Sequence, residues 1–339
     1  MPSARKTYQA GTPVPASLRS DRQCVPDAAV AVISLGRHAN YNWKESDHIQ
    51  ISHTALRDGR LSSFLKEEMK LSTGLVNRLK WQKKIFVNGQ PEHNDFAVKA
   101  GDVITVLLDE EAPDYPAEDG PLGILYEDEY LLAVDKPAGM LIHPSRSRND
   151  GTLANYVLGY YRRTGQKCAF HPVTRLDRDT FGIVLLTKYA YIHALMQQAE
   201  IKKTYHALVL GSPEADSGCI DAPIARRPLP SLLREVREDG KACLTRYRVL
   251  DRYDAYSRLA LQPVTGRTHQ LRVHCAHMGW PILGDPQYGN DQSDFGLPHQ
   301  MLCARCLEFI HPITGTKLML QSEMDVILDP PDRLPRRRS

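Results

Sequence analysis

The sequence contains no long hydrophobic run and only a small excess of positive charge. No stretch approaches the roughly 18 uninterrupted apolar residues that a membrane-spanning helix needs, and the first residues lack the apolar core of a secretory signal. The seven cysteines are scattered and odd in number, in a chain of 339 residues that is too long to need disulfide staples. We therefore expect reduced thiols, a cytoplasmic location and no membrane partner, and we exclude collagen-like, coiled-coil and disulfide-framework proteins.

Motifs for nucleotide and metal cofactors are also missing. The sequence has no P-loop, no dinucleotide-binding glycine fingerprint and no cluster of metal ligands with a familiar spacing. Hydrophobic residues make up 42% and charged residues 24%, which is an ordinary globular composition. We expect no cofactor and no bound metal, and about two domains at roughly 150 residues per domain.

The charged residues are unevenly distributed along the chain. Residues 57–108 hold nine basic and six acidic side chains, a local charge of +3, whereas residues 109–129 hold nine acidic and no basic ones. A basic module followed by an acidic, proline-containing connector indicates a domain boundary. The predicted organisation is an N-terminal extension (1–56), a small module (57–108), an acidic linker (109–121), a second domain (122–328) and a basic tail (329–339).

Residues 57–108 have the pattern of two short helices followed by a small sheet. Apolar residues at helical spacing predict a helix over 60–69 and a second one after Ser72, which is a good N-cap. Asn88-Gly89 indicates a tight turn between two strands, and a turn at 100–102 leads into a final β-rich run.

The second predicted helix of this module carries basic side chains around Trp81. They could bind phosphates while the indole stacks on a base, although a solvated helix face would give the same run of charge. The whole segment resembles the S4 RNA-binding module, most clearly at Arg60-Leu61, Val87-Asn88-Gly89 and Gly101-Asp102. The resemblance implies an RNA-binding surface that includes Arg60, Arg78, Lys80, Lys83 and Lys84.

Strands outnumber helices between residues 122 and 328. We expect helices over 152–163, 188–198 and 268–278, the last one ended by Gly279. Strands are expected over 181–187, 204–210, 241–250 and 258–264, and two more within 124–136. Because strand and helix do not alternate regularly, the pattern predicts an α+β domain around a mixed or antiparallel sheet flanked by helices.

Several segments of this domain contain reactive side chains, and each also has an ordinary structural explanation. In the segment VTRLDRDTFG (173–182), Asp177 and Asp179 flank an arginine, as in many solvated turns. The three histidines of TGRTHQLRVHCAHMG (265–279) lack the spacing of a zinc site. Arg272 lies beside the apolar stripe of the expected helix, and a buried arginine needs a carboxylate partner. A single Cys303-x-x-Cys306 indicates two ordinary thiols, and Tyr205 at a strand start is expected to pack in the core.

Taken together and in this order, the segments resemble RluA-type pseudouridine synthases that carry an N-terminal S4 domain. The resemblance runs from about residue 60 to 329 and includes YEDEYLLAVDKPAG, HPVTRLDRDTFG, KKTYHALVLG and TGRTHQLRVHCAHMGWPILGDPQYG. It implies that Asp177 is the catalytic carboxylate, that Tyr205 stacks on the target base and that Arg272 pairs with the carboxylate. Asp179 is expected to play a supporting part. Four further residues are expected to shape the site or to contact RNA: Arg175, Arg267, His269 and Gln270.

The reaction implied by this resemblance is the isomerisation of uridine to pseudouridine in RNA. It breaks the N1–C1′ bond, turns the uracil and rejoins it through C5, so it needs neither a metal nor a nucleotide cofactor. It does need an ionised carboxylate beside the ribose, and a close arginine favours that form. The target must leave its stack, which is cheapest in loops and bulges. The expected partner is RNA, with large-subunit ribosomal RNA as the first expectation and transfer RNA as the alternative, and a monomer is expected.

Two positions depart from the family pattern. Thr174 stands where many members have histidine, and Phe181 stands where many have serine. They are the sequence support for an alternative, a non-catalytic S4-type RNA-binding protein with a degenerate synthase domain. A metal-dependent hydrolase built on the histidine cluster is a third interpretation. The joint presence of Asp177, Tyr205 and Arg272 favours the enzyme.

Overall fold

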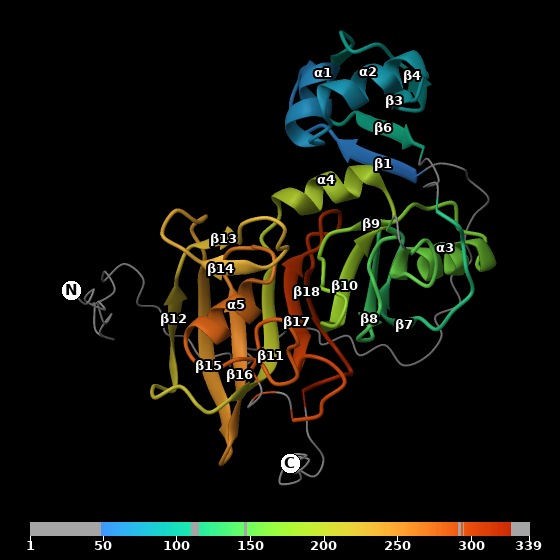
Figure 1. Ribbon diagram of the computed structural model, residues 1–339. Coiled ribbons are helices and arrows are strands. Elements are labelled where there is room, and N and C mark those ends of the chain that lie inside the picture. Colours follow the sequence, from blue (N-terminus) through green and yellow to red (C-terminus); the bar gives the residue numbers. More distant parts are fainter. Residues whose placement is uncertain (1–48, 110–114, 146–147, 291–292, 294, 327–339) are drawn as a thin grey trace, which may run out of the picture. The chain divides into compact units, whose positions relative to one another are not determined.

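The computed structural model describes residues 49–109, 115–145, 148–290, 293 and 295–326 (Figure 1). The predicted N-terminal extension up to residue 48, part of the acidic linker and the basic tail lie outside the described residues. Within the described ranges, no helix combines the length and the apolar character that crossing a membrane requires.

Residues 49–108 form a small sheet with short helices. The strand order is β1-β6-β3-β4, with antiparallel neighbours. Ser72 caps helix α2 as predicted, because its side chain accepts a hydrogen bond from the Leu75 amide at 3.2 Å. Asn88 and Gly89 both have positive φ and turn β3 into β4. The elements are β1 (Ile49–Thr54), β2 (Gly59–Arg60), α1 (Leu61–Ser63), η2 (Phe64–Glu68), α2 (Thr73–Trp81), β3 (Ile85–Val87), β4 (Gln90–Pro91), β5 (Ala97–Val98) and β6 (Val103–Leu108).

Strand β1 lies before the predicted start of the module at residue 57. It pairs with β6 along its whole length, from Ile49 opposite Leu108 to Thr54 opposite Val103. Ile49 and Ile51 alternate with exposed residues and bury their side chains in the core. The predicted boundary is therefore too late, because the strand at 49–54 completes the small sheet.

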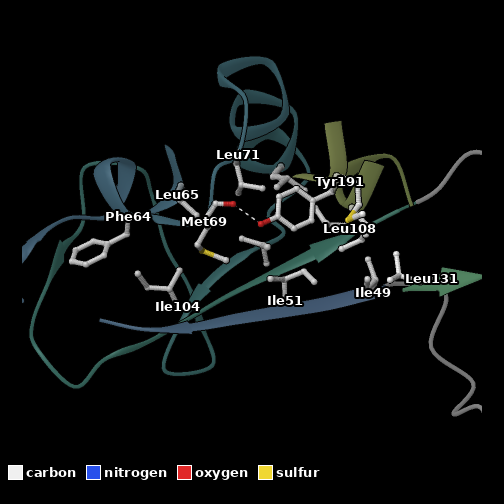
Figure 2. Packing of buried hydrophobic residues seen from close by; sticks show 14 of the residues in the cluster. Ile49, Ile51, Phe64, Leu65, Met69, Leu71, Ile104, Leu108, Leu131 and Tyr191 are labelled. Atoms are coloured by element: carbon white, nitrogen blue, oxygen red, sulfur yellow. Dashed lines mark hydrogen bonds between the residues drawn. The ribbon is translucent and has the colours of Figure 1, made fainter. Parts of the chain in front are cut away.

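A buried apolar cluster covers the small sheet and includes residues of helix α4 (Ala190–Gln198) (Figure 2). Phe64, Leu65 and Ile104 are fully buried in it. The Tyr191 hydroxyl donates a hydrogen bond to the main-chain oxygen of Met69. Because this cluster also holds side chains of the larger sheet, deleting the small module would expose apolar surface to water. Point variants are therefore the better test of its role.

A ten-stranded sheet forms the larger part of the described chain. Its path is β12-β15-β16-β11-β17-β10-β8-β7, with β18 paired to β17 and β9 to β10. The β10–β17 pair is parallel and the other pairs are antiparallel, so the predicted α+β fold around a mixed sheet is confirmed. Its strands are β7 (Gly123–Glu127), β8 (Leu131–Lys136), β9 (His171–Pro172), β10 (Phe181–Thr187), β11 (Lys202–Leu210), β12 (Ser217–Asp221), β15 (Leu244–Arg252), β16 (Tyr256–Pro263), β17 (Leu302–Ile310) and β18 (Lys317–Gln321).

Helices α3 (Leu153–Arg163), α4 and α5 (Gln270–His277) correspond to the three predicted ones. Thr152 and Asn155 form a capping box that starts α3. Gly279, with φ of +83°, follows the end of α5 in the left-handed conformation expected of a C′ residue. Helix α5 packs through Leu271 and Cys275 on an apolar face of the sheet.

Gly182 allows strand β10 to pair with β17. Its φ is +104°, and a Cβ atom at this position would lie 2.4 Å from the main-chain oxygen of Ala304. No other residue fits this approach without a shift of the backbone. The glycine therefore fixes where β10 begins, directly after the turn that carries Asp177.

Candidate active site

Asp177 lies in the turn between β9 and β10. The Thr180 amide donates to the Asp177 main-chain oxygen at 3.2 Å, which closes the turn. The Thr180 hydroxyl in turn accepts a hydrogen bond of 2.6 Å from the Gln300 side chain. The Asp177 carboxylate keeps 31% of its side-chain surface exposed, so the turn is held from behind while the carboxylate remains accessible.

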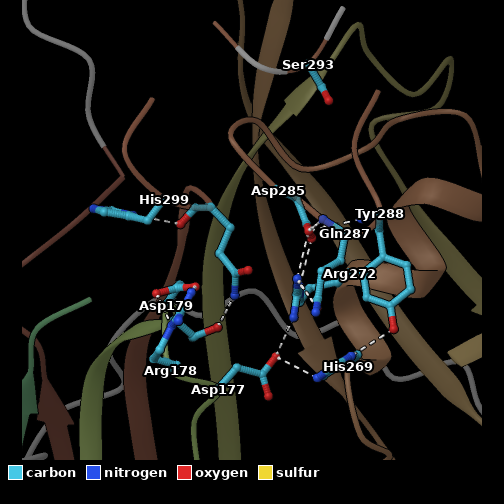
Figure 3. Close-up of polar contacts among 12 residues, drawn as sticks. Asp177, Arg178, Asp179, His269, Arg272, Asp285, Gln287, Tyr288, Ser293 and His299 are labelled. Atoms are coloured by element: carbon cyan, nitrogen blue, oxygen red, sulfur yellow. Dashed lines mark hydrogen bonds and ion pairs between the residues drawn. The ribbon is translucent and has the colours of Figure 1, made fainter. Parts of the chain in front are cut away.

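Arg272 projects from helix α5 toward this carboxylate (Figure 3). Its NH1 atom donates to Asp177 Oδ2 at 3.1 Å, and its side chain is only 5% exposed. The two residues are 95 positions apart in the sequence. The predicted pairing of a buried arginine with a carboxylate is therefore present in the structure, although it involves a second carboxylate as well.

Asp285 is the second partner of Arg272, and it was not among the predicted site residues. It accepts hydrogen bonds from Nε at 2.8 Å and from NH2 at 2.7 Å, and its side chain is fully buried. Gln287 accepts a further bond from NH2 at 2.9 Å. Burial alone would lower the pKa of Arg272, but hydrogen bonds and charge from Asp285 and Asp177 raise it above its ordinary value. The guanidinium is therefore a permanent cation with one nitrogen directed at Asp177.

His269 approaches the same oxygen of the Asp177 carboxylate as Arg272 (Figure 3). Its Nε2 atom lies 3.8 Å from Asp177 Oδ2, and its Nδ1 atom is 2.8 Å from the Tyr288 hydroxyl. The residue has φ of +58°, so the chain enters α5 through a left-handed turn. Burial lowers the pKa of His269 below its ordinary value of 6.5, although the charge of Asp177 opposes this shift. At neutral pH the ring is therefore a neutral hydrogen-bonding group.

These groups border a pocket of about 450 Å³. Asp177 and Arg272 line it together with Tyr205 from strand β11. The Tyr205 side chain is half-buried, at a β-bulge next to Thr204. Burial, and next the charge of Asp177, raises the pKa of Tyr205 above its ordinary value of 10.0. The pocket thus combines an accessible carboxylate, a fixed cation and a neutral aromatic ring.

Lys136 is a buried lysine beneath the turn. Its ammonium group donates three hydrogen bonds of 2.9 Å to the main-chain oxygens of Pro137, Met140 and Arg178. Burial lowers its pKa to about 8, against the opposing charges of Asp179 and Asp177. The lysine therefore ties the KPAG loop after β8 to the turn that carries Asp177, a role that the sequence analysis missed.

Asp179 is paired within the turn rather than with Arg272. Arg178 donates to it from Nε at 3.0 Å and from NH2 at 2.8 Å. This hydrogen bonding lowers the pKa of Asp179. The two neighbouring aspartates therefore differ in kind, because Asp179 is neutralised by an adjacent arginine while Asp177 faces the pocket.

Comparison with known proteins agrees with this arrangement. Residues 130–277 match the family described as RNA pseudouridylate synthase. An uncharacterised RNA pseudouridine synthase of Bacillus subtilis, YjbO, is 37% identical over 244 residues, which cover 70% of this chain and 86% of the relative. The chain belongs to the RNA pseudouridine synthase family. It is thus an enzyme of the class that isomerises uridine in RNA.

Two other members of this family illustrate the likeness. The ribosomal large subunit pseudouridine synthase D of Pseudomonas aeruginosa is 36% identical over 244 residues, covering 67% of this chain and 76% of that protein. The solved structure of human RNA pseudouridylate synthase domain containing 1 has a TM-score of 0.53 and 26% identity. It covers 64% of this chain and 89% of its own. The predicted fold and enzyme class of this RNA pseudouridine synthase are therefore confirmed.

The four residues predicted to shape the site or to contact RNA differ in their surroundings. Arg175 and Arg267 are exposed at the pocket, and His269 contacts Asp177 as described. Gln270 is 4% exposed, and its amide bonds to Thr265, to the Arg267 amide and to the start of β15. Gln270 therefore supports the loop before α5 from within, which is the first of the two roles expected of it, shaping the site.

The basic residues predicted for the surface of the small module, of which Arg78 and Lys80 lie on α2, are exposed with one exception. Trp81 is 86% exposed at the end of the helix, and Arg60, Arg78, Lys80 and Lys83 are exposed. Lys84 is instead half-buried and forms an ion pair with Asp109. Its charge is compensated by the first residue of the acidic linker, so the prediction that Lys84 belongs to the free basic face is wrong.

The remaining candidate segments have structural roles. His274 is fully buried, with hydrogen bonds of 2.9 Å to Thr245 and to the Ala222 oxygen, so it does not converge with His269. Among the described residues, no group of three histidine, cysteine or acidic side chains could hold a metal ion. Cys303 and Cys306 lie in strand β17, as expected of ordinary thiols.

Both departures from the family pattern are accommodated by packing. The Thr174 hydroxyl is buried and accepts a hydrogen bond of 2.9 Å from the Leu185 amide. Phe181 is 6% exposed and packs with Leu208, Leu283 and the edge of the His299 ring. Within the described residues, neither side chain forms a hydrogen bond with the Asp177 carboxylate. The turn between them is closed by the hydrogen bond from the Thr180 amide to the Asp177 main-chain oxygen.

Proposed function

We propose that this enzyme converts uridine to pseudouridine in structured RNA with Asp177 as its catalytic carboxylate. The observation that carries the proposal is the contact of 3.1 Å between Arg272 NH1 and Asp177 Oδ2 at the wall of the pocket. A carboxylate held beside a fixed cation stays ionised where water is partly excluded. An exposed, unpaired aspartate elsewhere on the chain would lack this property.

Each group of the pocket has a defined part in the proposed reaction. The Asp177 carboxylate either attacks C1′ or removes the C2′ proton, and in both routes the N1–C1′ bond breaks. The freed uracil turns and forms a bond from C5 to C1′. In the first route the Asp177–C1′ ester bond breaks as this bond forms, and in the second route C2′ takes its proton back from Asp177. C5 then loses its hydrogen to water as a proton. Tyr205 supplies a face on which the detached base can stack, a contact worth roughly 1–3 kcal/mol. Arg272 stabilises the carboxylate whenever it carries negative charge.

We propose large-subunit ribosomal RNA as the substrate, and transfer RNA as the alternative. The name of the Pseudomonas aeruginosa relative supports ribosomal RNA. The small module supports an RNA of substantial size, because its exposed Arg78, Lys80 and Trp81 offer phosphate and stacking contacts well away from Asp177 in the sequence. We take this module to act as an S4-type RNA-binding unit, in an enzyme that works as a monomer in the cytoplasm.

The proposal is tested by release of tritium from RNA labelled at uridine C5. Full-length protein is incubated separately with ribosomal and with transfer RNA transcripts, because rejoining through C5 sends that hydrogen into water. Release from ribosomal RNA only, abolished in Asp177→Asn and retained in Asp179→Asn, is the expected result. Asp179 is a matched control because it lies two residues away in the same turn and is paired with Arg178.

Two outcomes would contradict the proposal. If Asp177→Asn still releases tritium, the catalytic carboxylate is another residue. If the wild-type protein binds both RNA classes but releases tritium from neither, the non-catalytic RNA-binding alternative is favoured. Release from transfer RNA alone would change the substrate but keep the role of Asp177.

A further inference from the structure

Lys203 is a half-buried lysine in the wall of the catalytic pocket. It lies on strand β11, two residues before Tyr205, and both side chains line the pocket. Successive residues of a strand point to opposite faces of the sheet, so the preceding Lys202 is directed away from the pocket, and it is exposed. Of these two neighbouring lysines, Lys203 is therefore the one that faces a bound nucleotide.

The ammonium group of Lys203 lacks a counter-charge. Within the residues that the structure describes, its Nζ atom has no carboxylate at ion-pair distance and no hydrogen-bond acceptor. Burial lowers the pKa of Lys203 below its ordinary value of 10.5. In Lys136, by contrast, the charges of Asp179 and Asp177 oppose the same effect. Withdrawing a charge from water without a partner is unfavourable, so this cation does not stabilise the free protein.

The other cations of the pocket have partners or lie in water. Arg272 is held by two carboxylates, and Arg175 and Arg267 are exposed. Asp177 supplies the carboxylate among the described side chains that line the pocket, and Arg272 already contacts it. Lys203 is therefore a half-buried cation whose charge is left for an anion that arrives with the substrate.

We propose that Lys203 binds a phosphate of the RNA strand, at the nucleotide whose base stacks on Tyr205. This inference rests on the proposed function and names a phosphate site inside the catalytic pocket, separate from the basic residues of the small module. Its role is to hold the backbone of the target nucleotide while the base and the sugar react.

Phosphate fits this position better than a uracil oxygen does. A lysine ammonium is a compact point charge that suits a phosphate. Lys203 and Tyr205 are two strand residues apart, about 7 Å along β11, and the base and the phosphate of one nucleotide span a comparable distance. The charge of Asp177 raises the pKa of Tyr205, whereas the shift at Lys203 is caused by burial. The ammonium group is therefore farther from the reacting carboxylate than the tyrosine is.

The test uses the full-length protein and large-subunit ribosomal RNA tritiated at uridine C5. It measures RNA affinity as a function of salt, and the single-turnover rate of tritium release at saturating enzyme. Lys203→Met keeps the apolar stem and removes the charge. We expect its affinity to fall about ten-fold and the slope of log affinity against log salt to decrease by about 0.7 to 0.9, as for one lost phosphate contact. The rate at saturation should change less than the affinity, because the phosphate is bound before and during the reaction alike.

Two variants serve as controls. Lys202→Met removes the same charge one residue away on the other face of the sheet, so its affinity and salt slope should stay as in the wild type. Lys203→Arg keeps a cation in the pocket and should retain the wild-type salt slope. A loss that also occurs in Lys202→Met would assign the effect to net charge and would overturn the phosphate site.

Urea unfolding without RNA supplies an independent readout. Lys203→Met should be at least as stable as the wild type, because it removes a half-buried charge that has no partner. A lower unfolding midpoint for Lys203→Met than for Lys202→Met would mean that the charge of Lys203 serves the folded protein itself. The inference that this charge is left for the substrate would then be wrong.

The kinetic and binding outcomes separate the remaining alternatives. If Lys203→Met lowers the rate at saturation but keeps the wild-type salt slope, the lysine contacts the uracil and the phosphate site is overturned. An unchanged affinity and slope would overturn it as well. If the wild type releases no tritium, the proposed function fails. The phosphate site is then judged by affinity and salt slope, which need no turnover, and equal slopes for Lys203→Met and Lys202→Met overturn it.

Discussion

Asp285 accepts two hydrogen bonds from the Arg272 guanidinium, at 2.8 Å from Nε and 2.7 Å from NH2. This pairing uses one edge of the fork and leaves NH1 to contact Asp177 at 3.1 Å. A flexible arginine could reach either carboxylate in many rotamers, but one edge bound to a fully buried aspartate fixes its plane. We therefore infer that Asp285 is a positioning residue, which acts on the proposed reaction through Arg272.

Asp285→Asn should lower the turnover rate more than it lowers RNA affinity. Without the second carboxylate, Arg272 is held less firmly and can move by about 1 Å, a displacement that can cost about 100-fold in rate. Breaking a buried ion pair also destabilises a protein by about 3–5 kcal/mol, so urea unfolding must accompany the kinetics. The measurement is single-turnover tritium release below the unfolding transition, together with equilibrium RNA binding.

Gln287→Ala provides the comparison for that variant. It removes one hydrogen bond to Arg272 NH2 but no charge, and a typical single bond contributes about 1 kcal/mol. If both variants lose the same small amount of activity, the charge of Asp285 does not position Arg272.

Tyr288→Phe should reduce turnover modestly and leave RNA affinity unchanged. The Arg234 amide donates to the Tyr288 oxygen, so the hydroxyl proton can go to His269 Nδ1, and the ring proton is then on Nε2, facing Asp177. Losing the hydroxyl frees the ring to turn, at a cost of about 1 kcal/mol or about five-fold in rate. Single-turnover kinetics and binding on the same preparation check this. A variant with wild-type turnover would show that His269 needs no orientation.

Much of the fold could be predicted because local signals agree with the tertiary structure. Strand β10 has the predicted bounds, 181–187. A short, continuous apolar run that follows a turn is typical of a buried strand and is shorter than most helices. Helix α3 covers Leu153–Arg163, one residue shorter than the predicted range 152–163. Strand β1 was missed although Ile49 and Ile51 alternate with polar residues, because the preceding sequence is polar and gives no turn signal. Its residues pair with partners that lie 49 to 59 positions away in the sequence.

The site could be predicted only in part from the sequence. The pair Asp177 and Arg272 could be predicted from the resemblance. The contact between Asp285 and Arg272 depends on the geometry of the loop after α5, which no rule of sequence spacing describes. The motif GDPQYG contains Asp285 and was recognised only as part of the family pattern. Lys136 could not be foreseen as a buried cation, because all three of its partners are main-chain oxygens. Main-chain acceptors are present at every position and leave no signal in the sequence.

Mild acid should destabilise the enzyme through its buried histidines. Burial lowers the pKa of His143, His193, His269 and His274 below the ordinary value of 6.5. The unfolded chain therefore binds protons near pH 6.5 that the folded protein takes up only at lower pH. Stability rises with pH wherever the unfolded state binds more protons, so it is complete above that range and falls as the pH drops through it.

Urea unfolding at pH 7.5 and 5.5, at constant ionic strength, tests this prediction. The midpoint should be lower at pH 5.5, with an unchanged m-value. In His274→Gln, which replaces a fully buried ring, the difference between the two midpoints should shrink even though the variant is less stable at both pH values. Equal midpoints for the wild type at the two pH values would contradict the assignment of neutral buried histidines.

Trp81→Ala should weaken RNA binding without affecting stability. The indole is 86% exposed at the end of α2, so its removal creates no cavity. Stacking of an aromatic side chain on a base contributes roughly 1–3 kcal/mol, which corresponds to a loss of about 5- to 100-fold in affinity. The salt dependence should stay as in the wild type because no charge is lost, whereas Arg78→Gln should reduce it. Leu56→Ala, an equally exposed apolar residue of the small module at 85%, serves as the control. If Trp81→Ala and Leu56→Ala bind ribosomal RNA equally well, the face of α2 is solvated and does not contact RNA.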